Sequence, residues 1–338
     1  MVLNVTPLRA LIFGTGSIGR RHIANLQALR PDTVFAFVRA DLRRDALAEE
    51  LGAEVLADAA AGLAWQPDLA IIATPSDLHG PALAAMLDAG IACLIEKPVV
   101  TRAEEAAALQ SRPASSLPPT QVGCVLRFLP VVEQLQQWVR SGRLGRIARA
   151  SLQCGQYLPD WRPGTDYRQC YSADAARGGG VIFDLVHELD LAVSLFGNCT
   201  LRHVLAERRS TLELDCEDVA LLHLSGEAGE PIAIALDYVS RNPARTIQIV
   251  GEEATATLDF IGRSLVLQGP DGVIESTGEG FDAAAAYRLQ LKELLAAMAG
   301  GPAPRLPLHE GLRATHLAIE AHSQARTQLA NRAEEPTP

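Results

Sequence analysis

Short apolar runs alternate with helical patterns along the first third of the chain. Between the runs, apolar positions recur every three or four residues, as they do on one face of a helix. This alternation predicts a parallel sheet built from successive strand–helix units, with helices on both of its faces. Strands are predicted over 8–13, 33–38, 68–73, 91–95 and 121–126, with helices over 18–29, up to residue 87, and from residue 101 onward.

The pattern changes in the second half of the chain. Successive strand-like runs follow one another with no helical pattern between them, which predicts a largely antiparallel sheet and a second domain of the α+β class. Two helical patterns, over 281–299 and 309–331, close the chain. The predicted strands are 219–224, 231–239, 246–250, 254–260 and 264–267.

Composition narrows the classes of protein. A length of 338 residues with 48% apolar residues suits two globular domains. A net charge of -10 argues against a nucleic acid or an anionic membrane as partner. No apolar segment reaches the length of a membrane span and the N-terminus does not resemble a signal peptide, so we expect a cytoplasmic protein. The six cysteines form no CxxC pair, which favours reduced thiols and no metal site.

A glycine-rich loop joins the first predicted strand to the first helix. Its sequence is Gly14-Thr15-Gly16-Ser17-Ile18-Gly19. Glycines at this spacing permit a tight turn, close approach of backbone N–H groups to a pyrophosphate, and close packing of helix on strand. The loop predicts dinucleotide binding by the N-terminal domain, with Gly14, Gly16, Ser17, Ile18 and Gly19 as contact residues.

Arg39 ends the second predicted strand, about 20 residues after the glycine loop. An acidic side chain at this place would bind the ribose 2′-hydroxyl of NAD, whereas a cation suits the 2′-phosphate of NADP. Arg43 and Arg44 follow, although they also fit the solvated face of the next helix. We therefore predict that NADP is favoured and that NAD is possible.

Lys97 is one of only two lysines among 30 basic residues, and it follows the apolar run 91–95. A chain that otherwise uses arginine suggests that this position needs a compact ammonium, whose pKa responds to burial. The alternative is a surface lysine without a chemical role.

A second cluster of ionisable residues follows the glycines at 178–180. Asp184, His187 and Asp190 recur every three residues, which predicts one face of an amphipathic helix running to about residue 195. A histidine beside a carboxylate can act as a general base. The alternative is that Asp184 caps the helix and that His187 is a buried, satisfied side chain.

The segment 157–168 combines aromatic, cationic and turn residues without a regular pattern. Aromatic faces beside fixed donors suit a sugar ring, and arginine suits a carboxylate or phosphate carried by that ring. A proline-bounded surface loop anchored by Trp161 is the alternative. The predicted substrate-binding residues are Arg127, Tyr157, Trp161, Arg162, Tyr167 and Arg168.

Taken together, these motifs resemble the Gfo/Idh/MocA oxidoreductase family over nearly the whole chain. The motifs that carry the resemblance are the glycine loop with Arg20-Arg21-His22 after it, Thr74-Pro75 with His79, Glu96-Lys97-Pro98, and the triple glycine before His187. The resemblance implies a Rossmann dinucleotide-binding domain over 1–126 and an α+β domain over 127–333. The second domain would have an open, largely antiparallel sheet that binds substrate and joins a homodimer or homotetramer, and 334–338 would be a disordered tail.

The resemblance also implies roles for individual residues. Lys97 and His187 would be catalytic, with Asp184 as the partner of His187. Family members commonly place this aspartate four residues before the histidine, whereas Phe183 stands there and Asp184 is three before. Thr74, Pro75, His79 and Glu96 would contact the cofactor.

The implied activity is nicotinamide-dependent oxidation or reduction of a sugar, nucleotide sugar or cyclitol. Two alternatives stay open from the sequence: a hydrolase of the same fold that uses NAD transiently to break glycosidic bonds, and a nucleotide-sensing binding protein without catalysis. Retention of both Lys97 and His187 disfavours the second alternative.

Overall fold

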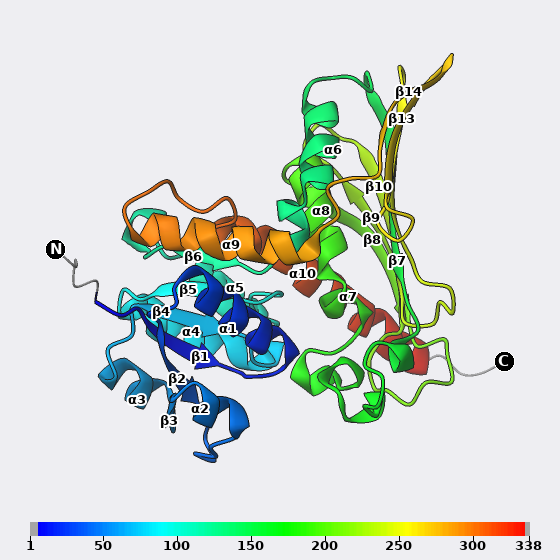
Figure 1. Ribbon diagram of the computed structural model, residues 1–338. Coiled ribbons are helices and arrows are strands. Elements are labelled where there is room, and N and C mark those ends of the chain that lie inside the picture. The colour runs from blue at the N-terminus through cyan, green and yellow to red at the C-terminus, as the bar shows by residue number, and fades with distance from the viewer. Residues whose placement is uncertain (1–5, 335–338) are drawn as a thin grey trace. The chain divides into compact units, whose positions relative to one another are not determined.

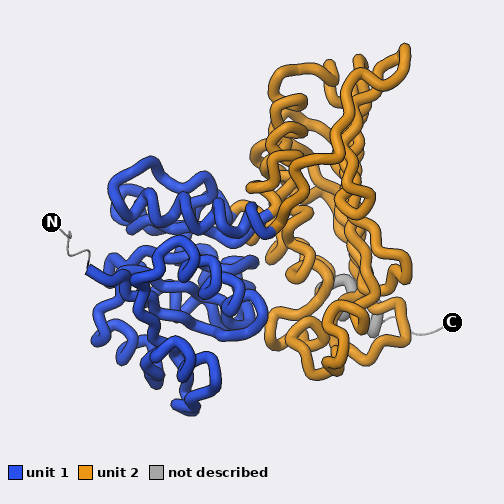
Figure 2. The backbone as a smooth tube through the Cα atoms, viewed as in Figure 1, with its two compact units in different colours: residues 1–125, 284–312 blue, residues 126–283, 313–338 orange. Residues whose placement is uncertain are grey.

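A computed structural model describes the backbone of residues 6–334 and the side chains up to residue 326. The chain folds into two compact units (Figure 2): residues up to 125 together with 284–312, and residues 126–283 together with 313 onward. No described helix is long and apolar enough to cross a membrane. The predicted tail begins at 334, and its residues 335–338 lie outside the described part of the chain.

The first unit contains a six-stranded sheet in the order β3-β2-β1-β4-β5-β6 (Figure 1), with every neighbouring pair parallel. This confirms the predicted Rossmann sheet. The strand order reverses between β1 and β4, and in sheets of this kind ligands bind at the carboxyl ends of the strands beside that point. The strands are β1 (Arg9–Phe13), β2 (Val34–Val38), β3 (Glu54–Leu56), β4 (Leu69–Ile72), β5 (Ala92–Ile95) and β6 (Thr120–Val122).

Strand β6 is shorter than the predicted run 121–126. It ends before Gly123, where a Cβ atom would lie 2.8 Å from the Glu96 carboxylate, and a 3₁₀ turn (Val125–Phe128) follows. The strand therefore ends at the position where the Glu96 carboxylate lies close to the backbone of Gly123. The helices of this unit are α1 (Ser17–Leu29), α2 (Ala46–Glu50), α3 (Ala59–Ala64), α4 (His79–Asp88), α5 (Ala103–Gln110) and, late in the chain, α9 (Ala283–Met298).

Helix α9 packs into the core of the first unit. Its side chains Leu291 and Leu294 are fully buried in the same apolar cluster as Ile12 of β1 and Leu26 of α1. Residues 284–312 thus group with the first unit, although the sequence pattern places them in the second domain. The limits of independently folding domains, 1–126 and 127–333, stay a prediction.

The second unit contains an eight-stranded sheet in the order β14-β13-β12-β11-β7-β10-β9-β8. Only β7 and β10 pair in parallel, so the largely antiparallel sheet is confirmed. Strands β7, β8 and β14 have no counterpart among the predicted runs. The strands are β7 (Ile147–Gly155), β8 (Thr200–Glu207), β9 (Val219–Ser225), β10 (Pro231–Asp237), β11 (Ala244–Gly251), β12 (Thr255–Asp259), β13 (Ser264–Gly269) and β14 (Gly272–Thr277).

Burial alternates along these strands because helices cover one face of the sheet. In β10, for example, Ile232, Ile234 and Leu236 are buried while their neighbours are more exposed. Helices α7 and α8 pack against β7, β9 and β10. The remaining helical bounds are α6 (Pro130–Arg140), α7 (Val181–Asp184), α8 (Val186–Phe196) and α10 (Leu308–Glu334).

Candidate active site

The glycine loop has the shape that a dinucleotide requires. Gly14 has φ +89°, and a Cβ on it would lie 2.5 Å from the Ala73 carbonyl oxygen; a Cβ on Gly19 would lie 2.1 Å from the Gly14 oxygen. Gly16, by contrast, faces open space and begins α1 without a side-chain cap. Gly14 and Gly19 are thus closely packed against neighbouring backbone atoms. The N-terminal end of α1, at Ser17 and Ile18, is left open to an anion. The predicted loop residues therefore fit a pyrophosphate.

Arg39 lies beside this loop. Its Nη2 donates to the Thr15 hydroxyl at 2.8 Å and to Asp45 Oδ2 at 3.0 Å, and its Nη1 donates to the Arg43 carbonyl at 2.7 Å. Arg43 and Arg44 are exposed in the segment before α2, not on the helix itself. Asp45 was not among the predicted residues, and the sequence around it offers only the signal of a helix N-cap.

Glu96 and Lys97 follow β5 at the same edge of the sheet. Glu96 is buried, and its Oε1 lies 2.7 Å from Nε2 of His22, a fully buried side chain of α1. Burial would raise the pKa of Glu96, but the hydrogen bond and charge of His22, helped by Lys97, hold it below its usual range. Glu96 is therefore a fixed negative charge next to the half-buried Lys97. His22 belongs to the motif after the glycine loop, but its pairing with Glu96 could not be read from the sequence.

His79 ties the loop after β4 to the loop after β5. Its ring nitrogens lie 2.9 Å from the carbonyl oxygens of Thr74 and Pro98. The side chain is almost fully buried, and this burial lowers its pKa, although the two carbonyl groups favour the protonated ring. Thr74 and Pro75 are thereby held at the edge of the sheet, where the Thr74 backbone closely approaches Gly14. The contacts of His79 are those of a brace between the two loops.

His79→Ala is expected to lower the free energy of unfolding by about 2 to 4 kcal/mol, because it opens a cavity and removes the bridge between two carbonyl groups. Urea denaturation followed by circular dichroism measures this loss. The matched control is His316→Ala on α10, where the side chain is only partly buried and a smaller loss is expected. A loss below about 1 kcal/mol for His79→Ala would contradict the bracing role.

The triple glycine of the second unit is needed for close backbone packing. Gly178 and Gly180 have φ +78° and +108°, and a Cβ on Gly179 would lie 2.2 Å from the Tyr171 carbonyl oxygen. The sequence pattern predicts one continuous helix after these glycines. In the structure the helix is broken at Leu185, between α7 and α8. Asp184 ends α7, and the half-buried His187 stands in the first turn of α8. The prediction of one uninterrupted helical face is therefore wrong.

Two tyrosines hold the carboxylate of Asp184. The Tyr238 hydroxyl donates to Asp184 Oδ2 at 2.8 Å, and the Tyr171 hydroxyl also bonds to this carboxylate. The charge of Asp184, followed by burial, raises the pKa of Tyr171, while burial and then Asp184 raise the pKa of Tyr238. Both hydroxyls therefore keep their protons and donate to Asp184. No motif in the sequence indicated either tyrosine.

Asp190 and Arg127 form a buried ion pair. The Arg127 Nη2 lies 2.7 Å from Asp190 Oδ1, and its Nε donates to Oδ2 at 2.9 Å. A similar pair joins the buried Glu188 to Arg245 at 2.6 Å and 3.0 Å. Asp184 and Asp190 thus have different partners. The geometry favours a structural role for Arg127, because its guanidinium binds the buried Asp190 carboxylate through two nitrogens.

The segment 157–168 packs largely on itself and its neighbours. Trp161 lies edge-on to Tyr238 with ring centroids 5.3 Å apart, and the Arg162 guanidinium lies 5.4 Å from the Tyr171 ring centroid. These two predicted residues therefore contact the tyrosines that hold Asp184. The others have separate partners: Arg241 covers the Tyr157 ring at 3.5 Å, Tyr167 accepts from the Glu213 N–H, and Arg168 pairs with Asp166 and Glu213.

The described residues contain no disulfide and no cluster of side chains that could hold a metal ion. All six cysteines are free thiols, and burial raises the pKa of Cys154 and of Cys199 to about 12. Among the residues with described side chains, no group of three histidine, cysteine or carboxylate side chains could hold a metal ion.

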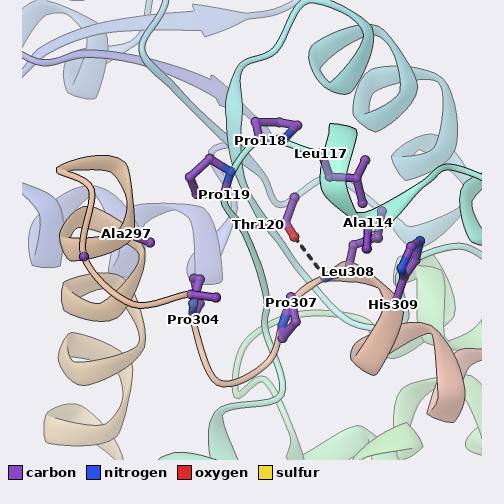
Figure 3. A pocket seen from close by; sticks show the side chains of 12 residues that line it. Ala114, Leu117, Pro118, Pro119, Thr120, Ala297, Pro304, Pro307, Leu308 and His309 are labelled. Atoms are coloured by element: carbon purple, nitrogen blue, oxygen red, sulfur yellow. Dashed lines mark hydrogen bonds between the residues drawn. The ribbon is translucent and has the colours of Figure 1, made fainter.

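An apolar groove of about 350 Å³ lies elsewhere on the first unit, beside β6 (Figure 3). The backbone N–H of Leu308 donates to the Thr120 hydroxyl in its wall. The groove is lined mainly by proline, alanine and leucine side chains, with His309 as its one titratable group, and none of the predicted cofactor residues lines it. It is therefore separate from the candidate site. The labelled lining residues are Ala114, Leu117, Pro118, Pro119, Thr120, Ala297, Pro304, Pro307, Leu308 and His309.

Comparison with known proteins shows the family and the fold of the chain. Residues 8–116 match the family described as "Oxidoreductase family, NAD-binding Rossmann fold", and residues 132–257 match the "GFO/IDH/MocA C-terminal domain". The chain is 28% identical over 285 residues to D-apiose dehydrogenase of Paraburkholderia graminis, which covers 81% of this chain and 73% of that protein. It is 27% identical over 259 residues to UDP-N-acetylglucosamine 3-dehydrogenase of Acidithiobacillus ferrooxidans, with 76% of each chain covered.

A solved structure shares the fold. An oxidoreductase from Agrobacterium radiobacter, crystallised with NAD⁺, L-tartaric acid and magnesium, superposes with a TM-score of 0.80 at 20% identity. The superposition covers 96% of this chain and 97% of that one.

Proposed function

The chain belongs to the GFO/IDH/MocA family of oxidoreductases, and we propose that it transfers hydride between a nicotinamide cofactor and a carbinol carbon of a sugar, nucleotide sugar or cyclitol. One observation carries this proposal. The glycine loop, Arg39, Thr74 and the Glu96–Lys97 pair all follow the carboxyl ends of parallel strands beside the point where strand order reverses.

Lys97 and His187 carry the proton chemistry in this proposal. A bound nicotinamide supplies the hydride acceptor or donor. His187 removes the proton from the substrate hydroxyl, and Lys97 donates a hydrogen bond to the same oxygen, which stabilises negative charge as the carbonyl forms. Glu96 keeps a negative charge beside Lys97, and Asp184, which Tyr171 and Tyr238 hold, stands three residues before His187 as its proposed partner.

The reaction class is tested by absorbance at the reduced-nicotinamide band. The purified protein is offered NAD or NADP together with sugars, uronic acids, inositols and nucleotide sugars. Net reduction of the cofactor with at least one member of the panel is expected. Release of a sugar without net reduction would instead identify a glycoside hydrolase, and nucleotide binding without either reaction would identify a sensing protein.

The proposed cofactor preference is NADP over NAD, and it rests on Arg39. Replacing Arg39 with alanine should weaken binding of NADPH about tenfold to a hundredfold and NADH much less, because only NADPH loses a charge-assisted hydrogen bond. Fluorescence titration of each reduced cofactor measures both affinities. The exposed Arg44→Ala is the matched control. Equal weakening of both cofactors would contradict the assignment of Arg39 to the 2′-phosphate.

The proposed substrate carries an anionic group that Arg162 recognises. Support comes from the position of Arg162 over Tyr171, which in turn bonds to Asp184. Arg162→Ala should raise KM about tenfold to a hundredfold with little change in kcat if the contact is equal in ground and transition states. Arg168→Ala is the matched control, because Arg168 is exposed and already paired with Asp166 and Glu213. Equal KM changes in both variants, or no change in either, would contradict this role.

We also propose a cytoplasmic homodimer or homotetramer joined through the second sheet. The face of that sheet away from α7 and α8 carries short and polar side chains, including Ser151, Gln153 and Ala233, together with the exposed Leu221. Short side chains allow another copy of the same sheet to approach this face closely, and Leu221 would then lose its exposure to solvent. Light scattering after size-exclusion chromatography measures the assembly, and a monomer at micromolar concentration would contradict it.

A further inference from the structure

The carboxylate of Asp45 forms an ion pair with Arg39, the residue proposed to bind the 2′-phosphate of NADP. Its Oδ2 lies 3.0 Å from Nη2 of Arg39 and 3.5 Å from Nη2 of Arg20, and Arg20 also donates to the Thr15 carbonyl oxygen at 3.1 Å. The glycine loop, two guanidinium groups and one carboxylate therefore share one corner of the first unit. Two cations and one anion leave this corner with a net charge of about +1 if all are ionised.

The carboxylate of Asp45 is held in place independently of Arg39. Its Oδ1 accepts a hydrogen bond from the backbone N–H of Ala48 at 3.0 Å and so caps α2. That backbone hydrogen bond, followed by the one from Arg39, lowers the pKa of Asp45, so the charge is present at neutral pH. A fixed carboxylate cannot simply move away when another anion enters.

Resting on the proposed function, we infer that Asp45 is a specificity-determining residue that favours the 2′-hydroxyl of NAD over the 2′-phosphate of NADP. It already occupies an Nη2 donor of Arg39 that a phosphate would use, and it repels a second anion there. A ribose hydroxyl, in contrast, can donate a hydrogen bond to a carboxylate. Arg39 and Asp45 thus act in opposite directions, and their balance sets how strictly the protein selects its cofactor.

Asp45→Asn tests this balance with little disturbance of the fold, because asparagine caps helices as well as aspartate does. The ratio of NADPH to NADH affinity, measured by fluorescence titration without substrate, should rise about tenfold to a hundredfold. The same ratio for 2′,5′-ADP over 5′-AMP, measured by competition, should rise equally, because these probes carry only the adenosine part of the cofactor.

Two further variants separate the mechanism from a general charge effect. Asp41→Asn removes the same charge from an exposed position in the same segment, where the carboxylate accepts from the Arg43 N–H, and it should leave the ratio within about twofold. In an Arg39→Ala background, Asp45→Asn should change the ratio less, because no donor is released and only the repulsion between Asp45 and the 2′-phosphate is removed.

The outcomes distinguish the inference from the function on which it rests. An unchanged ratio in Asp45→Asn, a ratio that falls, or an equal rise in Asp41→Asn would overturn the inference while the dehydrogenase assignment stands. A fall would mean that Asp45 positions Arg39 for the phosphate. Failure of the wild-type protein to bind any of the four nucleotides would overturn the proposed function and the inference with it.

Discussion

Lys97→Arg is expected to lower kcat/KM roughly 10²-fold to 10⁴-fold while cofactor affinity stays within a few fold. Arginine keeps the positive charge, but its side chain is longer than that of lysine and ends in a planar, forked guanidinium. Its N–H groups therefore do not reach the position that the lysine ammonium occupies. Its pKa also cannot fall toward neutrality on burial. Steady-state kinetics on the best substrate of the panel, with cofactor titration in parallel, measures both quantities.

The chain contains its own control for this substitution. Lys292, the other lysine, is exposed on α9, and Lys292→Arg should leave both kcat and KM unchanged. If Lys97→Arg keeps activity within a few fold of wild type, Lys97 has no part in the proton chemistry. If cofactor binding is also lost, the loop after β5 has rearranged, and the kinetic loss says nothing about the ammonium group.

Arg127→Met is expected to lower the free energy of unfolding by about 3 to 5 kcal/mol. The substitution leaves the carboxylate of Asp190, which is fully buried, without the guanidinium that neutralises it. A buried charge that loses its partner costs more than the ion pair contributes by itself. Urea or thermal denaturation of wild type and variant measures the difference.

Two variants serve as controls for the buried pair. Arg146→Met breaks an exposed pair with Glu252, so it should cost less than about 1 kcal/mol. Asp190→Leu in the Arg127→Met background should recover much of the lost stability, because no buried charge then remains. A stable Arg127→Met with a raised KM would instead restore Arg127 to substrate binding.

The sequence was informative wherever a feature depends on neighbours along the chain. Strand-length apolar runs predicted five of the six parallel strands, and only the short β3 was not predicted. The spacing of the glycines predicted the loop before α1. These features are local, because a turn or a helix face is set by residues within a few positions of one another. The central strand β7 was missed because its outward side chains are polar or charged, so its apolar run is short.

The partners of the buried polar groups were decided by tertiary structure alone. Tyr238 bonds to Asp184 across 54 positions, Arg127 to Asp190 across 63, and His22 to Glu96 across 74. Each carboxylate had to find a donor because a buried charge without one is strongly disfavoured, but several donors in the sequence could have served. Spacing every three residues suggested that Asp184, His187 and Asp190 act together, whereas packing broke the helix at Leu185 and gave the two aspartates different partners.

The chain thus determined by itself which residue types bear the chemistry and which fold carries them. Only the folded molecule decided which of these side chains remain available to a ligand. Arg39 illustrates both parts: its position after β2 was legible in the sequence, but the carboxylate of Asp45 at 3.0 Å was not. Six positions along an irregular segment do not fix a distance, because loop conformation depends on the packing of the elements that the loop connects.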